Sequence, residues 1–164
     1  MGMFEISLAV STLLCALVAG LLFAFASVVM PGIQGLNDRD FLRAFKAMDG
    51  VIQRNQPLFL MVWIGSVVVL LISFVLSFWY LEGIEHLLLI VAAAAYLLGV
   101  QLPTATVNIP LNNWLQGQDL DTATDLAIAE ARNRFESRWV KWNAIRAVFA
   151  VLASALLIVL SLRL

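Results

Sequence analysis

The chain alternates long apolar runs with polar stretches, and this alternation predicts its architecture. Four apolar runs each extend over about 20 residues or more, the length that a helix needs to cross the hydrocarbon core of a bilayer. Three runs hold no charged residue, and the fourth has Lys141 and Arg146 near its start. The pattern predicts an all-α fold: an integral membrane bundle of four transmembrane helices, in a single domain over residues 1–164. The predicted spans are residues 6–30, 58–81, 87–107 and 139–162.

The two long connections between the spans also have helical patterns. In the first, apolar residues recur at helical spacing and predict an amphipathic helix; they are Phe41, Phe45, Met48 and Ile52. Asn37 is the expected N-cap of this helix, because its side chain can accept a hydrogen bond from a free backbone N–H. In the second connection Gly117 breaks the chain. We expect the helix that opens at Asp119 to Asp125 to run into the fourth span without a stop.

The distribution of basic residues predicts the orientation of the bundle. Nine of the ten Lys and Arg residues fall in residues 31–56 and 132–146, and basic loops stay on the cytoplasmic side of a membrane. We therefore expect a multi-pass protein of a bacterial cytoplasmic membrane, with both termini outside and membrane lipid as its main partner. The net charge of -1 gives no basic field that would attract nucleic acid. The sequence leaves a homo-oligomer open.

Composition narrows the chemistry further. Hydrophobic residues make up 62% of the chain, against roughly 45–50% in a soluble domain. Cys15 and His86 are the only cysteine and histidine, so no metal site built from several imidazoles or thiolates is available. We predict neither a metal nor a cofactor. No carboxylate lies in the middle of a span, which argues against proton-coupled transport.

The third span becomes polar toward its cytoplasmic end. Two prolines there, Pro103 and Pro110, should kink or end the helix, as Pro31 should end the first span. Backbone freed in this way is tolerated at membrane depth only beside protein or a watery cavity. The segment is therefore predicted to face a polar pocket through three amides, Asn108, Asn112 and Asn113. Alternatively, these amides are packing groups that are satisfied within the protein.

One face of the fourth span gathers aromatic and polar side chains. It is formed by Phe135, Trp139, Trp142, Asn143 and Arg146. The apolar part that follows is shorter than the hydrocarbon core, so Arg146 should lie at or just inside the membrane boundary. We predict that it points into the bundle, although a guanidinium at this depth can also reach the headgroups.

Several polar groups are candidates to join Arg146 in one cavity. Glu136 or the amides of Asn108 and Asn112 could be its partners. Gln53 and Gln56, at the start of the second span, could face the same cavity.

Two motifs in these polar segments are similar to those of a known family. Residues 107–113 (VNIPLNN) and 135–146 (FESRWVKWNAIR) resemble the motifs of the small bacterial and fungal membrane proteins named for anthrone oxygenase, largely a domain of unknown function. Residues 51–59 and the region from Phe23 to Pro31 are similar to that family too, so the resemblance covers nearly the whole chain. It implies a four-helix membrane bundle.

The resemblance also implies a chemistry. The best-described members oxidise an anthrone carbon to a quinone with O₂, without metal or flavin. Such a reaction needs a dry aromatic pocket, a base and donors for an oxyanion. By matching positions, Trp139, Trp142 and Asn143 would line the pocket, and Asn108, Asn112 and Arg146 would donate. Many members carry a histidine where this chain has Ala144, which leaves Glu136 and Arg146 as the candidate catalytic residues.

Two functions follow as hypotheses. The first is a membrane protein whose cytoplasmic-side pocket binds a hydrophobic aromatic small molecule and, as the resemblance implies, could oxidise it. The second is a non-enzymatic structural or assembly protein, in which the Asn and Arg side chains hold the helices together.

Overall fold

The computed structural model describes residues 2–164, which form helices and short connections without a strand. Four helices are long and apolar enough to cross a membrane, as the sequence predicts. The first comprises α1 (Met3–Ala24), the π-helical turn η1 (Phe25–Val29) and α2 (Met30–Gln34). The second is α4 (Pro57–Tyr80), and the fourth is α7 (Asp125–Arg163). The third comprises α5 (Gly83–Tyr96), the π-helical turns η2 (Leu97–Gln101) and η3 (Thr104–Asn108), and α6 (Ile109–Gln116).

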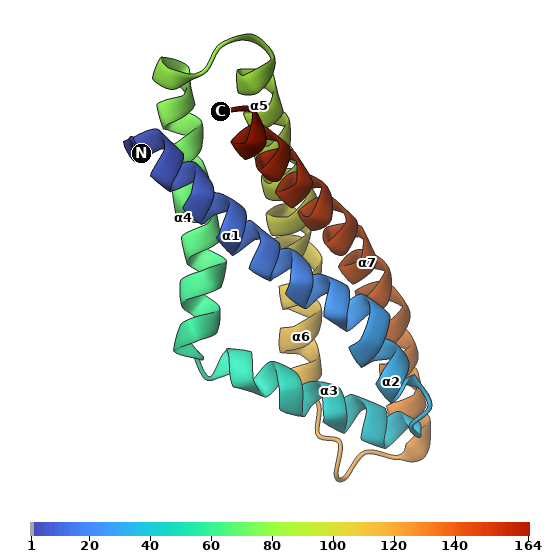
Figure 1. Cartoon of the computed structure of the whole chain (residues 1–164). Helices are drawn as coiled ribbons and strands as arrows, with labels where there is room; N and C mark the ends of the chain where they lie inside the picture. Colours follow the sequence, from blue (N-terminus) through green and yellow to red (C-terminus); the bar gives the residue numbers. More distant parts are fainter. Residues whose placement is uncertain (1) are drawn as a thin grey trace.

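The two ends of the bundle differ in what they carry (Figure 1). Both termini and the short turn between α4 and α5 lie at one end, and α3 (Asp38–Gln53) and the connection before α7 lie at the other. The second end holds the basic residues of α3 and of the start of α7. We call it the polar end.

The prolines do not end their helices, which corrects the sequence-based expectation. The first helix continues through Pro31 to Gln34, and the third continues through Pro103 and Pro110 to Gln116. Proline lacks a donor N–H and crowds the carbonyl four residues earlier. Wider π-helical turns lie next to these prolines, and such turns rearrange the backbone bonding without breaking the helix.

Helix α3 forms the floor of the polar end. Asn37 is its N-cap, as predicted, with its side-chain oxygen 2.9 Å from the backbone nitrogen of Asp40. Basic residues on α3 hold the connection before α7: Lys46 donates to the carbonyl of Gln118 at 2.6 Å, and Arg39 donates to the carbonyl of Ala123 at 2.9 Å. The two long connections are thus fastened to each other.

Helix α7 is a single element of 39 residues. Its N-cap is Thr124, whose hydroxyl accepts from the backbone N–H of Ala127. It runs from the polar end through the whole fourth span, as the lack of a stop signal predicts. Because it has no break, the side chains along one face of α7 keep a fixed relation to one another.

Packing within the membrane part depends on close helix contacts. A Cβ atom on Gly99 would lie 2.2 Å from Cγ of Phe149, so α5–η2 and α7 meet there without space for a methyl group. Many large apolar side chains remain exposed along the four long helices, as expected for surfaces that face lipid.

Replacing Gly99 with alanine should lower the free energy of unfolding by about 1–3 kcal/mol, the usual cost of overpacking. Gly32→Ala is the matched control, because nothing lies within 4 Å of its Cβ position. Thermal unfolding in detergent measures both variants. Equal unfolding midpoints for the two variants would contradict this prediction and would show that the helices can move apart at Gly99 at little energetic cost.

Candidate functional site

A cavity of about 250 Å³ lies where the four long helices meet α3 near the polar end. Its walls combine aromatic rings, aliphatic side chains and a few polar groups. The lining residues are Leu21, Leu22, Phe25, Phe45, Asp49, Ile52, Phe59, Leu60, Trp63, Thr104, Asn108, Ile109, Asn112, Trp139, Asn143 and Arg146. Five of them were predicted from the sequence as ligand-binding residues: Asn108, Asn112, Trp139, Asn143 and Arg146.

Arg146 is a buried cation in this cavity. Its side chain points into the bundle and is only 4% exposed. It donates to the hydroxyl of Thr104 at 3.0 Å and to Oδ1 of Asn143 at 2.9 Å. Within residues 2–164 it forms no ion pair, and its hydrogen-bond partners are not the ones expected, Glu136 or the amides of Asn108 and Asn112. Its Nε has no hydrogen-bond partner among the described residues.

Two asparagines position the groups around Arg146. Asn143 donates to the backbone carbonyl of Leu22 at 3.1 Å, which joins α7 to α1 beside the turn η1. Asn108 is 2% exposed, and its amide nitrogen lies 3.5 Å from the carbonyl of Trp139. Within the described part of the chain, Oδ1 of Asn108 has no partner. Two residues that line the cavity thus each keep one buried polar atom without a partner among the described residues, a donor on Arg146 and an acceptor on Asn108.

The cavity is also lined by a carboxylate that the sequence analysis missed. Asp49 on α3 is 4% exposed. It accepts hydrogen bonds from Asn112 at 2.8 Å, Gln116 at 2.7 Å and Gln53 at 3.3 Å. A buried carboxylate loses its hydrogen bonds to water, and three amide donors supply hydrogen bonds in their place. Asn112 in turn accepts from Nε1 of Trp139 at 2.8 Å, which connects Asp49 to α7.

The sequence contained a signal for Asp49. Phe41, Phe45 and Asp49 follow one another at intervals of four, so they lie on one helical face. All three are buried, whereas Met48, which was assigned to that face, is half-buried. A carboxylate on the apolar stripe of an amphipathic helix is the feature that could have identified it.

Three other predicted residues lie beside the cavity without lining it. Gln53 donates to Asn113 at 3.0 Å as well as to Asp49, so these two amides support the carboxylate from outside. Gln56 caps α4, where its side-chain oxygen accepts from the backbone N–H of Phe59.

Trp142 lies on a different surface from Trp139. It lines a shallow apolar groove between α5–η2 and α7, together with Gly99 and Phe149. Successive residues of a helix are about 100° apart, so Trp139 and Asn143 can face the cavity while Trp142 is turned away from it.

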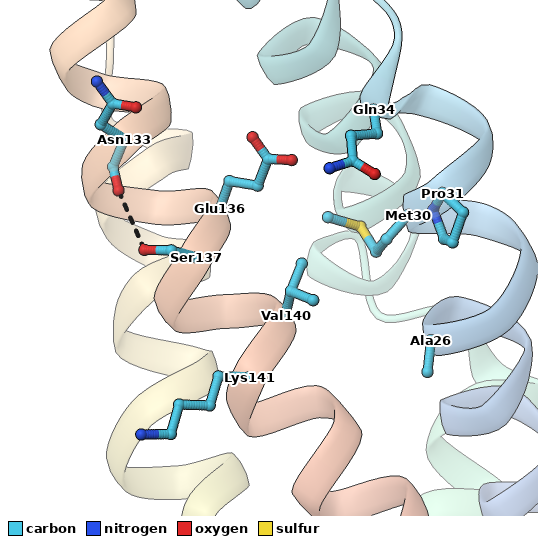
Figure 2. A pocket seen from close by; sticks show the side chains of 9 residues that line it. All are labelled: Ala26, Met30, Pro31, Gln34, Asn133, Glu136, Ser137, Val140 and Lys141. Carbon is cyan, nitrogen blue, oxygen red and sulfur yellow. Dashed lines mark hydrogen bonds between the residues drawn. The ribbon is translucent and has the colours of Figure 1, made fainter.

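Glu136 also lies outside the cavity. It borders a separate, open groove between α2 and α7, where it and Gln34 extend from opposite sides (Figure 2). Its carboxylate is bound to Arg132 at 2.7 Å. The structure therefore places Glu136 in an ion pair at the polar end and does not bring it to Arg146.

The cavity is lined by a guanidinium, a carboxylate and several aromatic rings. The Phe45 and Trp139 rings meet edge to face at 4.9 Å, and the Phe25 ring lies 5.7 Å from that of Trp139. Among the described residues no group of three or more His, Cys, Asp or Glu side chains could hold a metal ion. In general, aromatic rings can pack against a flat ring system, a guanidinium can donate hydrogen bonds to an oxygen, and a carboxylate can accept a proton.

Comparison with known proteins identifies the family. The family model described as anthrone oxygenase matches residues 48–156, well over half of the chain. This range includes Asp49, the third span and every cavity residue of α7. No curated protein and no solved structure matches the chain. The chain belongs to the anthrone oxygenase family.

Proposed function

We propose that the cavity binds a hydrophobic aromatic small molecule with an oxygen that faces Arg146. The observation that carries the proposal is the pair of unused polar atoms on two residues that line the cavity, Nε of Arg146 and Oδ1 of Asn108. A buried guanidinium without a counter-ion is costly, and unsatisfied buried groups in native proteins call for an explanation. A ligand oxygen at Arg146 and a ligand hydroxyl at Asn108 would satisfy both.

The size and walls of the cavity favour a ligand of a few fused rings. Small-molecule pockets usually enclose roughly 300–1,000 Å³, and this one is slightly smaller. Three rings, those of Phe25, Phe45 and Trp139, offer faces and edges to a planar partner. The polar groups are few and convergent, as in sites that orient an apolar ligand.

The family description suggests the reaction. In an anthrone oxygenation, a CH₂ group and O₂ give a carbonyl group and water: R₂CH₂ + O₂ → R₂C=O + H₂O. The CH₂ proton leaves to a base, and the enolate forms a carbon–oxygen bond with O₂. The resulting peroxide is reprotonated. It then loses its remaining C–H proton and hydroxide, so that the oxygen–oxygen bond breaks as the carbonyl forms.

In this proposal the two charged residues act at opposite sides of the ligand. Asp49 accepts the CH₂ proton and returns it to the peroxide, in the role that the sequence analysis had given to Glu136. Arg146 donates to the ligand carbonyl oxygen, where the enolate charge develops. Asn143 and Thr104 hold the guanidinium in place, and Asn112 orients Asp49.

A structural role for the same residues is the second candidate, and one observation favours it. The Asn143 bond to Leu22 and the Arg146 bond to Thr104 each join two different helices. If this role were the whole explanation, substitutions there would unfold the bundle rather than impair binding.

Purified protein in phospholipid nanodiscs tests the proposal. 1,8-Dihydroxyanthraquinone, a stable quinone, should bind saturably and quench tryptophan fluorescence. 1,8-Dihydroxyanthrone should be converted to that quinone with one O₂ consumed per quinone formed, faster than in empty nanodiscs. Saturable binding without accelerated conversion would refute the catalytic part, and no saturable binding would refute the function.

We also infer that the polar end faces the cytoplasm of a bacterial cell and that both termini lie outside. Leu126→Cys, at the start of α7, should react with a membrane-impermeant maleimide only in inverted vesicles. Leu164→Cys should react only in intact cells. Both positions are exposed, and the native Cys15 is buried and gives no background. The reverse pattern would overturn the orientation.

A further inference from the structure

We propose that the cavity is filled from the bilayer, through a gap between α4 and the η3–α6 segment. The ligand class is then a lipid-dissolved aromatic compound rather than a water-soluble one. This inference rests on the proposed function, because it concerns the route to the same site.

The polar end of the cavity is closed. Helix α3 lies across it, and Asp49 ties α3 to Asn112 and Gln116 of α6. Beyond this floor, Lys46 and Arg39 hold the connection before α7 against α3. A ligand that arrived from the aqueous phase would have to displace this network.

On the α4 side of the cavity, fewer side-chain hydrogen bonds join the helices. Helix α4 is joined to α5 just beyond the cavity, where Ser66 and Tyr96 share a buried hydrogen bond at 2.6 Å. Near the cavity, Trp63 donates to Gln101 of η2 at 3.1 Å. In the part of the chain that the structure describes, this is the only side-chain hydrogen bond from residues 57–65 to another helix. We call it the α4 latch.

The rim of this gap is apolar and exposed. Ile109 lines the cavity and yet is 47% exposed, more than any other lining residue. Leu58, Met61 and Ile64 of α4 and Leu102 of the third helix do not line the cavity, but they are exposed apolar side chains on the same two helices. These side chains belong to helices that are long and apolar enough to span a membrane, so the gap opens toward lipid.

The polar groups inside are placed for a ligand that arrives by this route. Its apolar rings would pass between Phe59 and Ile109, and its oxygen would reach Arg146 without crossing the α3 floor. A water-soluble ligand would have to pass through lipid first. Solubility in the bilayer is therefore a condition for binding.

Two substitutions of opposite effect test the route. Ile109→Trp narrows the gap, and Leu102→Trp is its control, because Leu102 is similarly exposed, at 52%, but does not line the cavity. Gln101→Leu removes the acceptor of the α4 latch. Stopped-flow mixing of 1,8-dihydroxyanthraquinone with protein in phosphatidylcholine–phosphatidylglycerol nanodiscs gives the association rate, and dilution into empty vesicles gives the dissociation rate.

Both rates should fall about tenfold in Ile109→Trp and rise about threefold in Gln101→Leu, because a change in the route alters both directions alike. The dissociation constant should then change less than about twofold in Gln101→Leu, because Gln101 does not line the cavity, and Leu102→Trp should match the wild type. Wild-type rates in Ile109→Trp or in Gln101→Leu would overturn the route while the proposed function stands. A wild-type protein that does not bind the probe would overturn both.

Discussion

Replacing Arg146 with methionine should weaken binding of 1,8-dihydroxyanthraquinone about 100-fold, or about 3 kcal/mol, while the bundle stays as stable as the wild type. The loss of affinity follows from the loss of Arg146, the only Lys or Arg among the described residues that line the cavity. Stability should persist because burying an unpaired guanidinium costs several kcal/mol. The acceptor left unsatisfied at Asn143 costs only about 1–3 kcal/mol. Fluorescence titration and thermal unfolding measure the two quantities.

Arg138→Met is the matched control for this experiment, because Arg138 lies on the same helix but is exposed. It should bind the probe as the wild type does. A large fall in the unfolding midpoint of Arg146→Met, with the affinity of the remaining folded protein unchanged, would contradict the ligand role. It would favour the structural one.

Replacing Asp49 with asparagine should lower the rate of 1,8-dihydroxyanthrone oxidation by about 100- to 10,000-fold, the usual contribution of a general base. The amide keeps the size of the side chain but cannot accept the CH₂ proton. Affinity for the quinone probe should change less than about threefold, because Arg146 remains in place. Oxygen uptake and fluorescence titration separate these effects.

Asp40→Asn, an exposed position on the same helix, should leave the rate unchanged. Glu136→Gln provides the competing test. If Glu136→Gln abolished turnover while Asp49→Asn did not, the base would be Glu136, the candidate from the sequence, despite its ion pair with Arg132.

The architecture was predictable because the bilayer imposes a simple rule on composition. A helix in lipid must satisfy its own backbone and present apolar side chains, so long uncharged runs identify spans directly. Helix α3 was predictable too, because Asn37 indicated where the helix starts and the apolar stripe indicated which of its faces is buried. The grouping of Trp139, Asn143 and Arg146 followed from helical spacing alone.

The rest of the site was harder to predict from the sequence, because lipid and protein core are both apolar. Hydrophobicity does not distinguish a helix face turned to lipid from one turned to the interior. Trp142 was therefore assigned to the pocket, although it faces the groove with Phe149. Asp49 was missed because its burial depends on contacts with Asn112 and Gln116, some 60 residues farther along the chain.

The uninterrupted course of α7 has a consequence for how this protein can vary. Trp139, Asn143 and Arg146 share one helix without a hinge, so an inserted or deleted residue between them would rotate part of the site by about 100°. The connection before Thr124 can change length without moving any of them. Related chains that keep this function should therefore differ in length at residues 117–124 and never within residues 139–146.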